Sequence, residues 1–332
     1  MLLLGAAALL AGGAATALPA RPGPTCLGAP ATIVGAGAID GTPGNDVIVG
    51  STGDDVIDGR GGNDRICGLE GDDVLVGGLG NDRISGGDGQ DRLRGDVQDP
   101  VNDAAGGGND WLDGGPGDDS VRGDSTSTGT ATGGGDDVLL GGPGDDSLLG
   151  DSRGSDAVGA GDDVLLGGPG DDVAIGDSFA VGDGFVGGTA RGNGGDDLID
   201  LGPGGSLAIG DNNSLGAAFG AGDDVIIGSD AADVLVGDSS PNVGFGYSGA
   251  GNDTVIGRGG DDVLFGDSTI DFATSIATAG GRDRLDGGTG DDILRAGPAD
   301  DRLDGSDGVA DDCDGEQGLD RARGCEVAAG IP

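Results

Sequence analysis

The sequence predicts an all-β protein, a parallel β-solenoid with about two nine-residue repeats in each coil. The first observation is a period of nine between residues 41 and 94, in which glycine, aspartate and one aliphatic residue recur. The second is composition, because 81 glycines and 2% aromatic residues do not allow a core anchored by aromatic side chains. The third is charge: 60 acidic residues oppose 16 basic ones, all arginines, and leave a formal charge of −44.

The repeat can be read without gaps from Gly41 as GTPGNDVIV, GSTGDDVID, GRGGNDRIC, GLEGDDVLV, GGLGNDRIS and GGDGQDRLR. One large aliphatic residue in nine cannot form the stripe of a helix, which needs three or four apolar residues per two turns. We therefore expect strands of three residues separated by six-residue turns. Prolines of several repeats fall at position 3, inside the turn, where no ladder hydrogen bond is lost. The inward-facing core should come from position 8, for example Ile48, Ile57, Ile66, Leu75, Ile84, Leu93, Leu112, Val121, Leu139, Leu148, Leu165 and Leu303.

Position 6 of the repeat is an aspartate almost throughout the chain. After Arg94 the repeats return in pairs, and LGPGGSLAI is a degenerate member in which Ser206 replaces the aspartate. The series continues less cleanly through Asp311 and Asp320. The candidate metal ligands are the position-6 aspartates Asp46, Asp55, Asp64, Asp73, Asp82, Asp91, Asp110, Asp119, Asp137, Asp146, Asp163, Asp172, Asp197, Asp224, Asp233, Asp253, Asp262, Asp283, Asp292 and Asp301.

A Gly-Asp pair and a polar insertion follow each second repeat in the middle of the chain. If one coil is two repeats, all insertions must emerge from the same edge. Two interpretations stay open: tolerated surface insertions, or an extended edge that binds a partner or a further cation. The insertions at 178–193 and 268–281 are the candidate partner contacts. Whether the Gly-Asp aspartates also ligate a metal is left open; they are Asp96, Asp124, Asp151, Asp177, Asp211, Asp238 and Asp267.

These nonapeptides resemble the hemolysin-type calcium-binding repeat of the RTX proteins, GGxGxDxUx. The resemblance spans roughly residues 41–323. It implies a right-handed parallel β-roll, and it implies that each position-6 aspartate ligates Ca²⁺ with help from backbone carbonyls of the glycine-rich turn. Calcium also suits the residues themselves, because it is a hard ion that takes 6–8 oxygen ligands. Position 5, usually Asp or Asn, either ligates or caps its own turn, and Ser206 and Ala231 mark weak sites.

Charge supports the same expectation. A chain this acidic should repel itself and stay expanded. About twenty Ca²⁺ ions would add roughly +40 against the formal charge of −44. We therefore expect multiple Ca²⁺ ions as cofactors and a chain that folds on binding them. Nucleic acid is not an expected partner, because the arginines are scattered and form no basic patch.

The ends of the chain differ from the repeats. Residues 1–20 read as a secretory signal peptide, cut after Ala17 or Ala20, which implies a secreted, extracellular protein without membrane insertion. Residues 21–40 and 305–332 read as an N-terminal cap and as degenerate repeats with a C-terminal cap; 41–94 are uninterrupted repeats and 95–304 paired repeats with insertions. Four cysteines in an exported chain favour disulfides. We expect pairing within each end, Cys26 with Cys67 and Cys313 with Cys325; buried reduced cysteines are the alternative.

No enzyme is expected. The chain has no histidine, so Ser-His and Cys-His nucleophiles are excluded. Repeated Asp-Asp pairs without an aromatic sugar platform do not suggest a glycosidase. Two functions remain. The first is a secreted calcium-binding β-roll. The second is a cell-surface adhesive or surface-layer protein whose edge insertions contact an envelope partner, with calcium purely structural.

Overall fold

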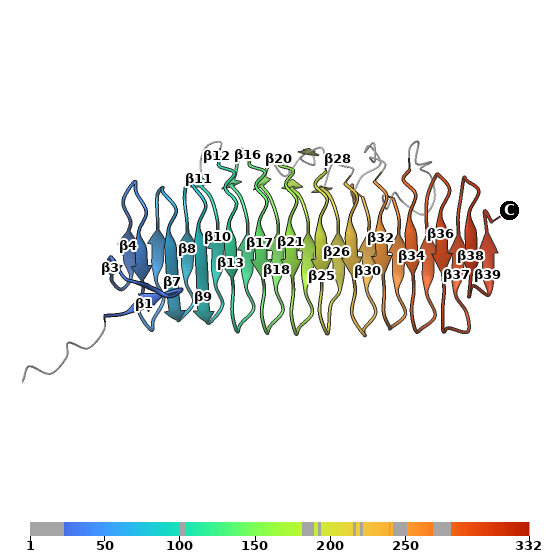
Figure 1. Cartoon of the computed structure of the whole chain (residues 1–332), viewed down its shortest axis with the longest axis horizontal. Coiled ribbons are helices and arrows are strands. Elements are labelled where there is room, and N and C mark those ends of the chain that lie inside the picture. The colour runs from blue at the N-terminus through green and yellow to red at the C-terminus, as the bar shows by residue number, and fades with distance from the viewer. Residues whose placement is uncertain are drawn as a thin grey trace, which may run out of the picture.

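The computed structural model describes residues 23–99, 104–180, 189–191, 194–214, 217–219, 222–238, 240–241, 251–267 and 280–331. All regular elements in these ranges are β-strands, and they stack into one long rod (Figure 1). The expected signal peptide lies outside the described residues. No helix in the described ranges is long and apolar enough to cross a membrane.

Two parallel sheets of 13 strands each form the body of the rod, and the chain visits them alternately. Sheet I contains β3 (Ile33–Val34), β5 (Val47–Val49), β7 (Arg65–Glu70), β9 (Arg83–Asp88), β13 (Trp111–Asp113), β17 (Val138–Leu140), β21 (Val164–Leu166), β25 (Leu198–Asp200), β29 (Val225–Ile227), β32 (Thr254–Ile256), β34 (Arg284–Asp286), β36 (Arg302–Asp304) and β38 (Arg321–Arg323). Sheet II contains β4 (Ala38–Asp40), β6 (Val56–Asp58), β8 (Val74–Val76), β10 (Arg92–Arg94), β14 (Ser120–Arg122), β18 (Ser147–Leu149), β22 (Val173–Ile175), β26 (Leu207–Ile209), β30 (Val234–Val236), β33 (Val263–Phe265), β35 (Ile293–Arg295), β37 (Asp312–Asp314) and β39 (Val327–Ala329).

The register of these sheets confirms the predicted β-roll with two nonapeptides per coil. Ile48 pairs with Ile66, and Ile57 pairs with Leu75, so each strand lies beside the strand 18 residues later. Where an insertion intervenes the step lengthens, yet Leu165 still pairs with Ile199. The register is therefore set by the repeat and not by the spacing along the chain.

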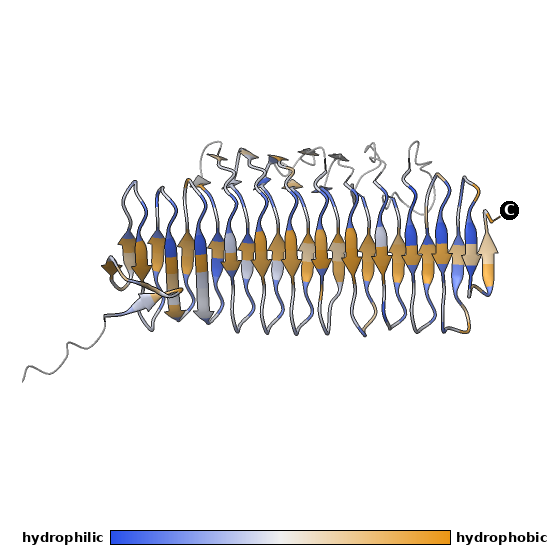
Figure 2. Ribbon diagram, viewed as in Figure 1, coloured by the Kyte–Doolittle hydropathy of each residue, from blue (hydrophilic) through white to orange (hydrophobic). Residues whose placement is uncertain are grey.

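The core is a single column of position-8 side chains between the two sheets. The residues that the sequence predicts for it are all buried, from Ile48 to Leu303. Figure 2 shows hydrophobic residues along the strands and hydrophilic ones in the turns between them. Alanine narrows the column at Ala174 and Ala208, which pair with each other. Close by in sequence, Leu201 replaces the position-1 glycine of the degenerate repeat, and its buried side chain joins the same core cluster.

Glycine is required in the turns because successive coils stack closely there. Gly78 and Gly80, at positions 2 and 4 of one repeat, have φ of 107° and 133°. A Cβ on Gly78 would collide with the carbonyl oxygen of Arg60, and one on Gly80 with that of Gly62, both in the preceding coil. Positive φ and close contact together exclude most other residues.

The insertions form two further parallel sheets along one edge of the rod (Figure 1). Where the structure describes them, they are strands and not irregular loops. Sheet III contains β11 (Gln98–Asp99), β15 (Thr126–Ser127), β19 (Arg153–Gly154), β23 (Phe179–Ala180), β27 (Asn213–Ser214) and β31 (Ser240–Pro241). Sheet IV contains β12 (Ala104–Ala105), β16 (Thr130–Thr132), β20 (Asp156–Val158), β24 (Thr189–Arg191) and β28 (Ala217–Phe219).

A second small core joins the insertions to the body of the rod. Leu149, Ile175 and Ile209, at the ends of sheet II strands, form a buried cluster against which Phe179 of sheet III packs. The described part of the insertion at Phe179 is thus packed against the body of the rod. Most of the expected partner contacts at 178–193 and 268–281 lie outside the described residues.

The expected disulfides are present at both ends. Cys26 bonds to Cys67 and joins the antiparallel hairpin of β1 (Thr25–Cys26) and β2 (Ala29–Pro30) to sheet I. Cys313 bonds to Cys325 and ties β37 to the final turn. Neither bond reaches beyond its own end of the rod, so the middle coils depend on other interactions.

Candidate metal centre

The position-6 aspartates form two rows along the rod, one leading into each main sheet. We call them row I and row II. Row I precedes the strands of sheet I and contains Asp46, Asp64, Asp82, Asp110, Asp137, Asp163, Asp197, Asp224, Asp253, Asp283, Asp301 and Asp320. Row II precedes the strands of sheet II and contains Asp55, Asp73, Asp91, Asp119, Asp146, Asp172, Asp233, Asp262, Asp292 and Asp311.

One carboxylate oxygen of nearly every member links two coils. In row I the backbone N–H of Asp46 donates to Oδ1 of Asp64, and the N–H of Asp64 donates to Oδ1 of Asp82, each at 2.7 Å. The same bond repeats to Asp320 at 2.7 to 2.9 Å. The aspartates of row II make the same N–H to Oδ1 bond between successive coils, with one interruption. Each aspartate side chain therefore reaches back to the preceding coil.

The other oxygen is buried and has no hydrogen-bond partner. All twenty predicted aspartates are buried, and most are at most 3% exposed. Oδ2 is without a partner in 17 of them, the exceptions being Asp46, Asp55 and Asp233. An unpaired buried carboxylate oxygen is costly, and such a group in a native structure calls for a bound ion or water.

A cradle lies beside most of these oxygens, at the glycine that follows the preceding strand. A Cβ on Gly141 would lie 2.3 Å from Oδ2 of Asp146 and 2.6 Å from the carbonyl oxygen of Gly167 in the next coil. A Cβ on Gly59 would meet Oδ2 of Asp64 and the carbonyl oxygen of Gly77 in the same way. These separations are close to Ca–O distances of about 2.3–2.6 Å. The missing side chain leaves a space lined by oxygens of two coils.

Burial raises the pKa values of these carboxyl groups. For Asp64 burial, opposed by the N–H of Asp46, raises the pKa to about 6. Beneath the insertions the shift is larger: burial, and then the charge of Asp238, raise the pKa of Asp253 to about 11. Burial raises the pKa of Asp146 in row II, away from the insertions, to about 7. The insertions therefore make row I the less hydrated of the two edges.

Position 5 makes a bond that neither of its two expected roles describes. Its side chain is exposed and reaches forward: Oδ1 of Asn45 accepts the N–H of Asn63 at 2.9 Å, and Oδ1 of Asp54 accepts that of Asp72 at 3.1 Å. The doubled aspartates thus point in opposite directions along the rod. Position 5 bonds the next coil on the surface, and position 6 bonds the preceding coil in the interior.

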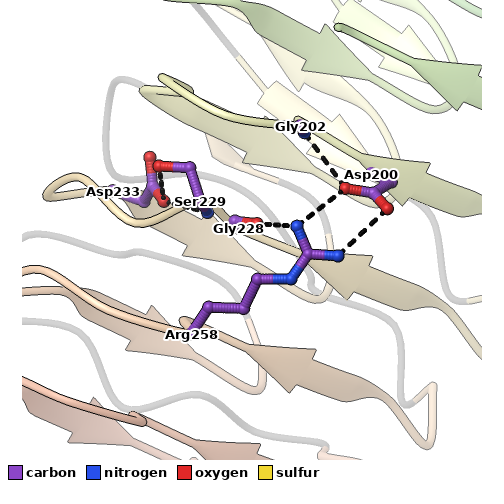
Figure 3. Close-up of polar contacts among 6 residues, drawn as sticks. All are labelled: Asp200, Gly202, Gly228, Ser229, Asp233 and Arg258. Atoms are coloured by element: carbon purple, nitrogen blue, oxygen red, sulfur yellow. Dashed lines mark hydrogen bonds and ion pairs between the residues drawn. The ribbon is translucent and has the colours of Figure 1, made fainter. Parts of the chain in front are cut away.

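Three turns satisfy the second aspartate oxygen without an ion. They carry Thr or Ser at position 2, four residues before the aspartate. Ser229 donates to Oδ2 of Asp233 from its N–H at 2.7 Å and from its hydroxyl at 3.0 Å (Figure 3). Thr42 does the same for Asp46, and the N–H of Ser51 does so for Asp55. These sites have less need of a cation than their neighbours.

An arginine reinforces the turn at Ser229. The guanidinium of Arg258 lies at 3.2 and 3.1 Å from the two oxygens of Asp200, two coils away in sheet I, and donates to the carbonyl oxygen of Gly228 at 3.0 Å (Figure 3). One positively charged side chain therefore spans three coils at this point.

Row II is interrupted at Ser206, the residue that the sequence identifies as a weak site. The hydroxyl of Ser206 donates to the carbonyl oxygen of Asp172 at 3.0 Å. In other members of row II, Oδ1 accepts an N–H from the preceding coil. Oδ1 of Asp233 has no partner, because Ser206 stands where the preceding aspartate would be. Ala231, the other expected weak site, lies in the turn that Ser229 closes, where its N–H donates to the Ser229 hydroxyl at 2.9 Å.

Residues outside the repeat pattern end the rows. Glu326 accepts the N–H of Asp311 at 2.9 Å, as the next aspartate would. The hydroxyl of Thr32 donates to Oδ1 of Asp46 at 3.3 Å at the other end. Asp311 and Asp320 are full members of their rows, and each has an Oδ2 without a partner. The sequence signal that identifies them is their spacing, ten residues from Asp301 to Asp311 and nine from Asp311 to Asp320.

The donor set fits Ca²⁺. It consists of carboxylate and carbonyl oxygens, with no histidine or free thiol, and hard cations prefer such ligands. Within the described ranges no group of three or more Asp, Glu, Cys or His side chains converges to hold one ion. Each site would therefore take its aspartates singly or in pairs and complete its coordination with backbone carbonyls.

Together the fold and these rows define a parallel β-roll with repeated, buried carboxylate sites between its coils. The chain matches the model of the RTX calcium-binding nonapeptide repeat over 40–75, 68–100, 104–126, 131–152, 157–180, 220–242, 246–273 and 278–309, more than half its length. It belongs to this RTX repeat family. No curated protein matches the sequence. The unmatched stretch between 180 and 220 contains the coil with Leu201 and Ser206.

Proposed function

We propose that this protein is a secreted calcium-binding β-roll that binds Ca²⁺ between its coils through the position-6 aspartates and folds on binding it. The observation that carries the proposal is the repeated Oδ2 that is buried, unpartnered and adjacent to a carbonyl oxygen of the next coil. The family match supports calcium as the ion. RTX repeats typically serve as structural and binding modules, and we propose no catalysis.

Two processes could relieve the charge of these rows, protonation and cation binding. Protonation satisfies a carboxyl group only if its new O–H finds an acceptor. A divalent cation neutralises two carboxylates and also uses the neighbouring carbonyl oxygen. Ca²⁺ accommodates such an irregular set of oxygens, whereas Mg²⁺ demands a tighter octahedron. We therefore assign Ca²⁺ to the 17 predicted aspartates with an unpartnered Oδ2, and weaker sites to Asp46, Asp55 and Asp233.

A pair of neighbouring substitutions tests the assignment. Asp146 is buried in row II, and Asp145 beside it is exposed at position 5. Asparagine keeps the oxygen that accepts an N–H at each position, from Asp119 at position 146 and from Asp171 at position 145, and removes the same charge. We expect Asp146→Asn to lose about one or two bound Ca²⁺ ions per chain, measured by equilibrium dialysis at neutral pH, while Asp145→Asn keeps the wild-type number. Equal counts in the two variants would contradict the assignment.

A surface role for the insertions is the second candidate function, with calcium purely structural. The observation that favours it is their order, because sheets III and IV continue in register over several coils. Fractionation of the producing cells separates the two. We expect the protein free in the culture medium. Retention at the envelope, with release on deletion of an insertion, would favour the surface role.

A further inference from the structure

A third row of aspartates lies at the insertion edge, outside the nonapeptide pattern. It consists of the aspartates that follow the sheet II strands in Gly-Asp pairs, one per coil. We call it the insertion-edge row: Asp96, Asp124, Asp151, Asp177, Asp211, Asp238 and Asp267. Each of these residues is at most 3% exposed. We propose that the insertion-edge row is a second series of Ca²⁺ sites, distinct from the position-6 sites.

Successive carboxyl groups of this row lie within hydrogen-bonding reach of each other. Asp124 approaches both Asp96 and Asp151, and Asp177 approaches both Asp151 and Asp211. The contacts continue through Asp238 to Asp267. Row I runs along the same edge, and its Asp163 is close enough to add its charge to that of Asp151. Two rows of acids therefore share one buried edge.

One oxygen of these aspartates has a structural role. Oδ2 of Asp96 accepts the N–H of Gly108 at 2.8 Å, and Oδ2 of Asp124 accepts that of Gly135 at 3.1 Å. Oδ1 of Asp267 accepts the N–H of Gly281 at 3.1 Å. These bonds close each insertion where the chain returns to row I. They leave the other oxygen unexplained: it has no partner in Asp96, Asp124, Asp177, Asp238 or Asp267, and Asp151 has no partner for either oxygen.

The residue after each aspartate supplies an independent observation. Ser125, Ser152 and Ser178 are fully buried, and their hydroxyls have no hydrogen-bond partner. Asn212 occupies the same register position in the next coil. Its Nδ2 donates to Oδ2 of Asp177 at 3.2 Å, so side chains at this position face the row. Buried hydroxyls beside buried carboxylates are an oxygen-only donor set that suits a hard cation.

Shared protons do not account for this arrangement. A proton between two carboxyl groups would leave the three serine hydroxyls unsatisfied. Among the described ion pairs none joins an arginine to this row. A divalent cation between neighbouring coils would use both the orphan carboxylate oxygens and the hydroxyls.

The row occurs only in the coils whose sheet II strand is followed by an insertion. In two earlier coils the chain leaves β6 through Gly59 into Arg60, an exposed residue with φ of 74°, and leaves β8 through Gly77 into Gly78. In the covered coils the corresponding turn begins with Gly-Asp, and the aspartate is buried. The coils that carry insertions therefore have a second row of buried carboxylates, in addition to row I.

The test compares two triple variants of the full chain. Asp124→Asn, Asp151→Asn and Asp177→Asn together remove three charges from the row. Asp118→Asn, Asp145→Asn and Asp171→Asn remove three charges from exposed position-5 residues of the same coils. We expect the first variant to bind about two to four fewer Ca²⁺ ions per chain, by equilibrium dialysis, with β structure retained by circular dichroism. The second variant should bind the wild-type number.

An unchanged Ca²⁺ count and calcium midpoint in the first variant would overturn the proposal, because protonated carboxyl groups tolerate asparagine. If that variant does not fold, the combined Ser125→Ala, Ser152→Ala and Ser178→Ala variant keeps every charge. We expect it to require several-fold more Ca²⁺ for folding, and an unchanged midpoint would again overturn the proposal. A wild-type chain that binds no Ca²⁺ would refute the position-6 sites as well, so the two failures are distinguishable.

Discussion

Removing calcium with excess EDTA is expected to unfold the coils of this protein. Extracellular modules bind Ca²⁺ with Kd of about 10⁻⁴–10⁻³ M. At about 1 mM free Ca²⁺ each site then contributes roughly 0.4–1.4 kcal/mol, or about 8–28 kcal/mol over twenty sites. A whole domain is typically stable by about 5–15 kcal/mol. The free energy of Ca²⁺ binding is therefore at least as large as the typical free energy of unfolding of a whole domain.

The measurement is far-ultraviolet circular dichroism in EDTA and again after Ca²⁺ is restored. Trp111, the one tryptophan of the chain, follows Asp110 and lies under the guanidinium of Arg83 at 5.1 Å from its ring centroid. Its fluorescence gives a local record of the same transition. Mg²⁺ at equal concentration is the control and should restore much less structure. Full β structure in EDTA would show that the coils close without metal.

Acidification is expected to have opposite effects on the metal-free and the calcium-loaded protein. Burial raises the pKa of Asp110 to about 9 and that of Asp119 to about 7, from a usual value of 3.8. The folded metal-free chain therefore holds protons that the unfolded chain releases. Its free energy of unfolding rises as the pH falls from about 9 towards 4, and it levels off below that, where the unfolded chain becomes protonated too. Calcium binding needs ionised carboxylates, so it weakens over the same range.

Circular dichroism at pH 7.5 and pH 5 checks both expected effects, on the metal-free and on the calcium-loaded protein. In EDTA we expect more β structure at pH 5 than at pH 7.5. In low Ca²⁺ we expect the midpoint of calcium-induced folding to move to higher concentration at pH 5. Sedimentation velocity is needed beside it, because the isoelectric point is about 4.1 and aggregation would imitate folding. A metal-free chain equally disordered at both pH values would contradict the sign of the pKa shifts.

The body of the rod could be predicted from the sequence because each repeat position has a single task. Leu139 fills the core and Asp137 bonds the preceding coil, and both follow from their places in the nonapeptide. Pairing of Cys26 with Cys67 followed from their shared end of the chain.

The insertion sheets could not be predicted, because the inserted segments have no common period or length. Their strands align only because each insertion starts and ends at fixed points of the repeat. Glu326 was missed for a related reason: it lies outside the nine-residue spacing but beside Asp311 in space. The Ser229 turn did have a signal, a hydroxyl residue four positions before the aspartate, which Thr42 and Ser51 share.

The constant register of coils that differ in chain length has a consequence for how such a protein changes over generations. Because an added segment leaves the stack at one edge, copying or deleting the DNA for one coil preserves the strand pairing between neighbouring coils. Each copy would lengthen the rod by about 4.8 Å, the spacing of adjacent strands. The number of coils therefore determines both the length of the rod and the number of ions that it can bind, while the two disulfide-bonded ends stay the same.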